Sequence, residues 1–147
     1  MTSPPDFTGL LRGSALRVTR PRLAVLTAVH RHPHADTTAI VQAVRADLGT
    51  VSPQAVYDVL HALTVARLVR RIEPAGSVAR YEARVGDHHH HLLCRSCTAI
   101  ADVDSAVGET PCLTPPGDLG FAIDDTEVIF WGRCPACTAA GVASPAT

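Results

Sequence analysis

The stretch GDHHHHLLCRSC, from Gly86 to Cys97, joins four consecutive histidines to a Cys-x-x-Cys pair in the interior of a 147-residue chain. A purification-tag scar, a single zinc site, or two metal sites with different roles would each account for it. A tag is disfavoured because the run leads directly into a cysteine pair and lies between two patterned regions. One metal site and two metal sites remain, and the neighbouring sequence distinguishes between them.

A second pair, Cys134-x-x-Cys137, follows the first pair, Cys94-x-x-Cys97, after 36 intervening residues. Two such pairs can hold one zinc ion in a tetrahedron of thiolates, which is a closed, structural site. Paired redox dithiols are the alternative, but two matched pairs favour zinc. We therefore predict that these four cysteines bind structural Zn(II) and that the binding energy contributes to folding. The fifth cysteine, Cys112, is expected to be a small buried apolar residue, and a reactive or metal-binding role is less favoured.

The four histidines can be sorted by geometry if the run is a β-strand. Alternate side chains of a strand point to opposite sides, so His89 and His91 share one face, and His88 and His90 share the other. Carboxylates that could complete a site lie nearby in the sequence: Glu82, Asp102 and Asp104. A mixed histidine and carboxylate set suits Fe(II), Mn(II), Co(II) or Zn(II). A solvent-exposed histidine run with adventitious metal affinity is the alternative.

The charge is divided unequally between the two halves of the chain. The formal net charge is −1, but residues 1–86 carry eleven arginines against six acidic residues. Residues 87–147 carry two arginines against eight acidic residues. This asymmetry predicts a basic module that binds an anionic partner, joined to an acidic module that binds metal. Two solvated surfaces of chance composition are the alternative.

Three helix signals precede two strand-like runs in the basic half. Helices are expected in VTRPRLAVLTAVHRH, HADTTAIVQAVRADLG and TVSPQAVYDVLHALTVA, with Thr19, Asp36 or Thr37, and Ser52 as their N-caps. The following RLVRRIEPAGSVARYEARV has two runs typical of strands around a Pro-Ala-Gly turn. This order predicts a winged helix-turn-helix, whose third helix can enter the major groove of DNA.

Several residues of this half are candidates for DNA contact, because basic side chains meet phosphates and the exposed face of the third helix meets bases. The candidates are Arg17, Arg20, Arg22, Ser52, Gln54, Tyr57, Arg70 and Arg71. Ordinary solvated arginines on a small helical domain are the alternative.

No apolar run approaches the roughly 20 residues that a membrane-spanning helix needs. The N-terminal MTSPPDFTGL lacks the charged start and apolar core of a signal peptide. We therefore expect a cytoplasmic protein with reduced cysteines and without membrane association. A small-molecule substrate is not expected either.

The order of a winged helix, ARYEARVGDHHHHLLCRSC and EVIFWGRCPAC resembles the ferric uptake regulator (Fur) family of bacterial metal-dependent repressors over about residues 10–138. It is most similar to the FurA/CatR-type branch of high-GC bacteria, which is associated with control of catalase-peroxidase and peroxide defence. The resemblance implies an α+β fold and a homodimer on a palindromic double-stranded DNA operator, with no enzymatic activity. The implied organisation is a flexible N-terminus at 1–9, a winged-helix DNA-binding domain at 10–84, a small α/β dimerisation domain with a four-cysteine zinc site at 85–138, and a flexible tail at 139–147.

The family's metal sites can be carried over position by position. Cys94, Cys97, Cys134 and Cys137 match its structural zinc ligands, whereas its regulatory site, which takes ligands from both domains, matches His34, Glu82, His89, His91 and Asp102. The resemblance implies Fe(II) or Mn(II) as the regulatory ion, with Zn(II) able to bind in vitro. Metal binding would shift the population toward the DNA-competent conformation.

The chain departs from the family's usual pattern at three places. A further site would be weak and would use His88, His90 and Glu109, because His90 stands where Asp is common and Thr126 stands where a later His falls. The third helix reads Tyr57-Asp58 instead of the common Tyr-Arg, which implies a different operator sequence. Three prolines in GETPCLTPPGDLG imply that a longer helix of the family is short or broken here.

The resemblance also bears on the signal. Asp102 is typical of the family's peroxide sensors, in which bound Fe(II) generates an oxidant that modifies a ligand histidine, here His34 or His89. Glu82 is closer to the pattern of its iron sensors. A zinc- or nickel-sensing regulator of the same family is an alternative. A zinc-dependent hydrolase and a metal storage protein are alternatives from other classes.

Overall fold

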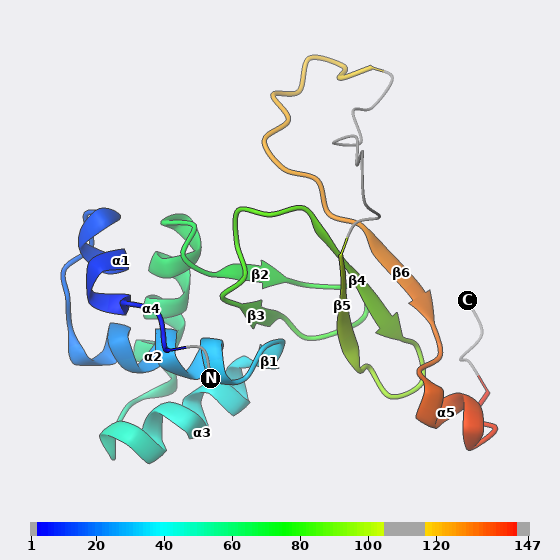
Figure 1. Cartoon of the computed structure of the whole chain (residues 1–147), viewed down its shortest axis with the longest axis horizontal. Coiled ribbons are helices and arrows are strands. Elements are labelled where there is room, and N and C mark those ends of the chain that lie inside the picture. Colours follow the sequence, from blue (N-terminus) through cyan, green and yellow to red (C-terminus); the bar gives the residue numbers. More distant parts are fainter. Residues whose placement is uncertain (1–2, 105–116, 144–147) are drawn as a thin grey trace. The chain divides into compact units, whose positions relative to one another are not determined.

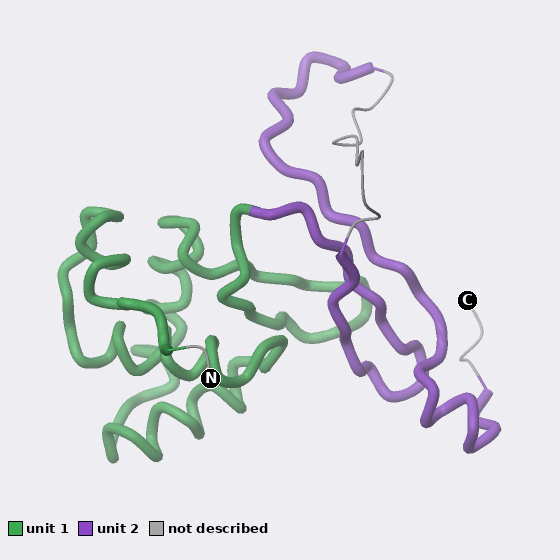
Figure 2. The backbone as a smooth tube through the Cα atoms, in the orientation of Figure 1, with its two compact units in different colours: residues 1–86 green, residues 87–147 purple. Residues whose placement is uncertain are grey.

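The computed structural model describes residues 3–104 and 117–143. The chain divides into two compact units, residues 1–86 and residues 87–147 (Figure 2). Glu109, Cys112 and most of the proline-rich segment expected to interrupt a helix lie outside the described residues. The architecture is α+β, with a winged helix-turn-helix first and a small mixed unit second.

The first unit has four helices and three short strands (Figure 1). The elements are α1 (Phe7–Gly13), α2 (Arg20–Arg31), β1 (Ala35–Asp36), α3 (Thr37–Leu48), α4 (Pro53–Val65), β2 (Arg70–Ile72) and β3 (Arg80–Glu82). The predicted N-caps are confirmed, because the side chains of Thr19, Asp36 and Ser52 each accept a hydrogen bond from the backbone N–H three residues later, at 3.3, 2.8 and 3.1 Å. These local bonds fix where α2, α3 and α4 begin.

The wing is a three-stranded antiparallel sheet in the order β1-β3-β2. The two-residue strand β1, which the sequence did not predict, pairs Ala35 with Tyr81 and Asp36 with Arg80. On the other edge of β3, β2 pairs Arg71 with Tyr81. The chain segment before α3 is thereby attached to the wing.

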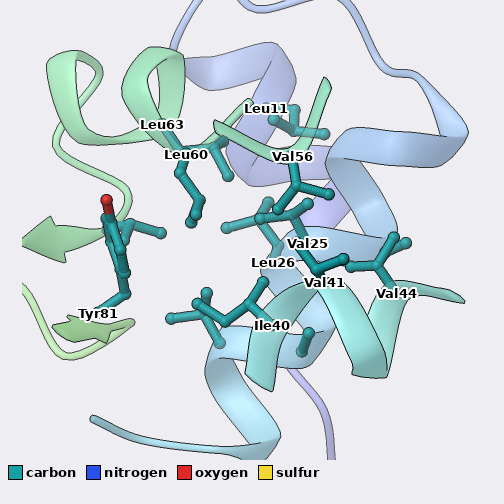
Figure 3. Packing of buried hydrophobic residues seen from close by; sticks show 14 residues of the cluster. Leu11, Val25, Leu26, Ile40, Val41, Val44, Val56, Leu60, Leu63 and Tyr81 are labelled. Carbon is teal, nitrogen blue, oxygen red and sulfur yellow. The ribbon is translucent and has the colours of Figure 1, made fainter. Parts of the chain in front are cut away.

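The core of this unit lies between α2, α3 and α4 (Figure 3). Its fully buried side chains include Val29, Val44 and Leu60, one from each of these helices. Tyr81 of β3 closes one side of the core. Helix α1 was not expected, since the first nine residues read as a flexible tail; fully buried Leu11 anchors it to the core.

The described residues of the second unit form a three-stranded sheet followed by one short helix (Figure 1). The elements are β4 (His89–Cys94), β5 (Ile100–Asp104), β6 (Ile129–Gly132) and α5 (Pro135–Ala139), with strand order β5-β4-β6. Strand β4 is antiparallel to β5 and parallel to β6. Among the described residues of this unit, Leu93 and Cys94 are the buried apolar ones. Two buried apolar side chains stabilise this described part of the unit only slightly, so a metal or a partner subunit would add stability here.

None of the described helices combines the length and the apolar character that crossing a bilayer requires.

Candidate metal centres and nucleic-acid interface

The two cysteine pairs converge on one point of the second unit. Cys94 ends β4 and Cys97 lies in the turn after it, whereas Cys134 caps the N-terminus of α5 and Cys137 lies within that helix. The four sulfur atoms all lie within 4.8 Å of one another. The Sγ atoms of Cys97 and Cys134 are 3.7 Å apart. Four thiolates at about 2.3 Å from zinc stand about 3.8 Å from one another in a tetrahedron, so the cluster fits this ion.

Hydrogen bonds within this cluster shift the pKa of two of its thiols in opposite directions. Hydrogen bonds from the backbone N–H groups of Cys134 and Cys97 lower the pKa of Cys94 to about 6. Hydrogen bonds with the side chains of Cys134 and Cys97 raise the pKa of Cys137 to about 12. Four adjacent thiols are unlike isolated ones, because each thiolate that forms repels the next, and a cation is needed to compensate the charge. A divalent ion would supply that charge and hold all four sulfurs deprotonated.

Two histidines of β4 and one aspartate of β5 form a second cluster on the sheet. His89 and His91 are buried, and their rings are 4.8 Å apart, as expected for alternate residues of a strand. Asp102 lies opposite His91 in the β4–β5 register. Its Oδ1 is 3.5 Å from Nε2 of His91 and 3.9 Å from Nε2 of His89. Ligand atoms of one ion at about 2.1 Å stand about 3.0–3.5 Å apart, so a small inward shift of His89 would let all three bind one divalent ion.

Asp87 orients one of these histidines. Its Oδ1 is 2.8 Å from Nδ1 of His89, which leaves Nε2 of His89 on the side of Asp102. A carboxylate that accepts a hydrogen bond from the second ring nitrogen fixes the tautomer of a ligand histidine and raises its basicity. Asp87 was not among the predicted residues; the available signal was its position two residues before His89, on the same side of an extended chain.

His34 and Glu82 form a third pair, within the first unit. Nε2 of His34 is 3.3 Å from Oε2 of Glu82, and the Glu82 side chain is almost fully buried. His34 has a φ of 64°, which is uncommon for a residue with a side chain. Its N–H donates to the carbonyl of Tyr81 at 2.9 Å, and its carbonyl accepts from Nη1 of Arg80 at 3.3 Å. Strand β3 therefore holds a strained backbone in place and aims His34 at Glu82.

The other two histidines of the run lie in different surroundings. His88 is exposed and precedes β4, whereas His90 packs edge-on against Phe130 with ring centroids 5.9 Å apart. The third residue expected at a weak extra site, Glu109, lies outside the described residues. Thr126 is exposed.

The face of α4 that points away from the core carries the predicted base contacts. Val56, Leu60 and Leu63 are buried in the core, whereas Gln54 and Tyr57 are exposed, Tyr57 to 50%. A hollow of about 370 Å³ separates α4 from the wing and is lined by Tyr57, Asp58, His61, Thr64, Arg71 and Tyr81. The exposed face of α4 and strand β2 therefore border the same hollow.

The predicted phosphate contacts all lie in the first unit. Arg17 precedes α2, Arg20 is its first residue, and Nη1 of Arg22 donates to the carbonyl of Arg17 at 2.7 Å. On β2, Arg71 pairs with Glu73 at 2.7 Å, whereas Arg70 is half-buried. Ser52 is exposed, and its hydroxyl caps α4. This arrangement can present helix N-termini and guanidinium groups to a polyanion.

Comparison with known proteins gives one consistent result. The model of the ferric uptake regulator family matches residues 13–130. The transcriptional regulator FurA of Mycobacterium tuberculosis (strain H37Rv) is 65% identical over 138 residues, which cover 94% of each chain.

Solved structures of the same family share the fold. The ferric uptake regulator of Vibrio cholerae superimposes with a TM-score of 0.67 at 25% identity, over 88% of this chain and 100% of that one. The ferric uptake regulator of Pseudomonas aeruginosa with manganese has a TM-score of 0.68 at 21% identity, over 89% and 99% of the two chains.

Proposed function

Because the chain belongs to the ferric uptake regulator family, we propose that it is a metal-dependent repressor that binds a palindromic DNA operator as a homodimer. The chain is a transcriptional regulator and not an enzyme. The observation that carries the metal dependence is the presence of two chemically distinct clusters in one small unit, four thiols in one and a histidine–carboxylate set in the other.

We assign structural Zn(II) to Cys94, Cys97, Cys134 and Cys137. The support is the convergence of their sulfur atoms and the few buried apolar side chains among the described residues of the second unit. Zinc binding would join the end of β4 to α5 and supply folding energy to this unit. Four protein ligands leave no open position, which suits a structural role.

We assign the regulatory ion, Fe(II) or Mn(II), to His34, Glu82, His89, His91 and Asp102. The support is ligand chemistry, because nitrogen and carboxylate oxygen ligands suit these ions and are less selective for zinc than thiolates. When bound, the ion supplies positive charge beside the buried Glu82 and the partly buried Asp102. The five side chains would hold the DNA-competent conformation, and the population would shift toward it as metal binds.

The homodimer is supported by apolar residues on the exposed side of the second sheet. Leu92 and Phe130 are neighbours in the β4–β6 register and are 45% and 50% exposed. A hollow of about 230 Å³ beside them is lined mostly by apolar groups of all three strands. An exposed apolar patch of this kind marks an interaction surface. A two-fold dimer would present two copies of α4 to the two halves of a palindrome.

We further propose that peroxide relieves repression. The controlled genes would serve oxidative-stress defence, such as a gene for a catalase-peroxidase, or iron homeostasis. The support is Asp102, whose residue type is the one found in the family's peroxide sensors. His34 and His89 are the ligands that metal-centred oxidation would modify, after which the site would hold metal more weakly.

The experiment is retardation of duplex DNA by the zinc-loaded protein in a series of divalent ions. We expect retardation with Mn(II) or Fe(II) and its loss when peroxide is added to the Fe(II) form. A response confined to Zn(II) or Ni(II) would instead identify a sensor of those metals. Unaltered retardation after peroxide would show that peroxide does not relieve repression.

A further inference from the structure

The exposed face of α4 carries a hydrogen-bonded pair that neither zinc nor the regulatory ion explains. Nε2 of Gln54 donates to Oδ1 of Asp58 at 2.8 Å, one helical turn further along. Both residues are exposed, and both lie on the side of α4 away from the buried Val56 and Leu60. The pair therefore sits where a recognition helix meets the major groove.

An acidic residue in this place needs an explanation. Asp58 lies beyond the first turn of α4, so the positive end of the helix dipole, whose effect fades within that turn, gives it little stabilisation. It borders the hollow that Arg71 also lines. On a surface that approaches phosphates, a carboxylate lowers the affinity for DNA. We therefore look for its role in the selectivity among DNA sequences.

The contact with Asp58 fixes which way the Gln54 amide faces. A carboxylate can only accept hydrogen bonds, so the amide nitrogen must turn toward Asp58 and the amide oxygen away from it. The amide then retains one N–H and the oxygen Oε1 for an external partner. Free glutamine can rotate its amide by half a turn and exchange these two groups.

On this basis we infer that Gln54 and Asp58 act as one base-reading unit that selects adenine and rejects guanine at one position of each operator half-site. Adenine offers an amino group at N6 and an acceptor at N7, which match Oε1 and the remaining N–H of Gln54. Guanine offers acceptors at both O6 and N7, which the oriented Oε1 and the Asp58 carboxylate repel. Gln54 is the contacting residue, and Asp58 is a positioning residue that also excludes guanine. The inference rests on the proposed DNA-binding function.

Two variants of Asp58 separate its two roles. In Asp58→Ala, the Gln54 amide can rotate, so the preference for adenine over guanine should fall by roughly ten-fold, the scale of one base contact. In Asp58→Asn, the side-chain oxygen can still accept from Gln54 while the new amino group faces outward, so guanine should be admitted. Both variants remove a negative charge and should bind DNA of arbitrary sequence somewhat more tightly.

The controls use other residues of the same unit. Gln54→Ala should lose the same discrimination as Asp58→Ala, and the double variant should lose no more, because the two residues act together. Asp47→Ala removes another exposed carboxylate, from α3, and should keep the wild-type sequence preference. Thermal unfolding of each variant should match the wild type, since all three side chains are exposed.

The experiment starts from the full-length, zinc-loaded protein with Mn(II) and a pool of duplexes with a randomised core. The wild-type protein should select a palindrome, and at one adenine per half-site replacement by guanine should weaken binding roughly ten-fold. Replacement of that adenine by 7-deazaadenine should weaken wild-type binding but leave Gln54→Ala unaffected. If Asp58→Ala and Asp58→Asn select the wild-type sequence with the wild-type discrimination, the inference is wrong while the proposed function stands. If the wild-type protein selects no sequence, the proposed function fails and the inference fails with it.

Discussion

His91 of β4 lies directly opposite Asp102 of β5, and its Nε2 is 3.5 Å from Oδ1 of Asp102. Two adjacent strands thus place a nitrogen and an oxygen ligand at the separation that one divalent ion requires. The same strand presents Cys94 three residues later to a different cluster. A single strand therefore serves both proposed metal centres, the exchangeable one and the structural one.

Replacing His91 by Ala should weaken Mn(II) binding by more than roughly 100-fold, because loss of a ligand exceeds the 10- to 100-fold cost of losing its hydrogen-bond partner. Zinc content and the thermal unfolding transition should stay near wild type. Isothermal titration of the zinc-loaded protein with Mn(II) measures this. The matched control is His90→Ala, on the opposite face of β4, and an equal loss of affinity in that variant would contradict the assignment.

Asp87→Asn should reduce Mn(II) affinity by roughly 10- to 100-fold without abolishing binding. The amide still contacts Nδ1 of His89 but no longer favours the tautomer that leaves Nε2 available. The same titration checks the effect, with Asp124→Asn as a control because Asp124 is exposed in the same unit. Wild-type affinity in Asp87→Asn would show that the 2.8 Å contact has no role in metal binding.

Cys94→Ser should remove zinc and unfold the second unit while the first unit stays folded. The only tryptophan of the chain, Trp131, lies on β6 and reports on that unit alone. Its emission should shift to longer wavelength, whereas the helical signal of the first unit should persist. Cys112→Ser is the matched control and should keep its zinc; zinc loss in both variants would make the cluster assignment wrong.

Zinc affinity should also depend on pH in a defined direction. The pKa of Cys94 is lowered to about 6, so its thiolate is available at neutral pH and is lost as the pH falls through about 6. The pKa of Cys137 is raised to about 12, so this thiol is protonated at neutral pH and must release its proton when zinc binds. Affinity should therefore fall steeply below about pH 6, and zinc binding at neutral pH should release protons. Calorimetry in buffers of different ionisation enthalpy measures both, and pH-independent binding would contradict thiolate ligation.

Leu92→Asp or Phe130→Asp should convert the dimer to a monomer, since a charge placed in the centre of an apolar interface removes a major contact. We expect the dissociation constant of the dimer to rise at least about 30-fold, the effect of losing about 2 kcal/mol. Sedimentation equilibrium measures it. Val78→Asp, at an exposed apolar position in the first unit, is the control. Dimers that persist in both sheet variants would place the interface elsewhere.

Local signals made much of the fold predictable. Thr19, Asp36 and Ser52 begin three helices through hydrogen bonds that span three residues, so the sequence alone reveals them. The alternation of the histidine run was equally readable, because strand geometry separates His89 and His91 from their neighbours. The convergence of the two cysteine pairs followed from their matched spacing.

The features that the sequence did not reveal depend on partners far along the chain. Strand β1 exists because Ala35 pairs with Tyr81, and α1 is held by burial of Leu11 in a core built by later helices. The left-handed backbone of His34 depends on hydrogen bonds to β3. No local pattern encodes such contacts, so they emerge only in the folded chain.

We propose that metal bound to the histidine–carboxylate set controls DNA binding. The decisive quantity is the dissociation constant of the zinc-loaded protein for its selected duplex, measured by fluorescence anisotropy with and without Mn(II) at several salt concentrations. We predict that Mn(II) tightens binding at least about ten-fold, within the range of known couplings between sites, and that His91→Ala abolishes the difference. Equal affinity with and without Mn(II) at every salt concentration would show that this metal does not control DNA binding.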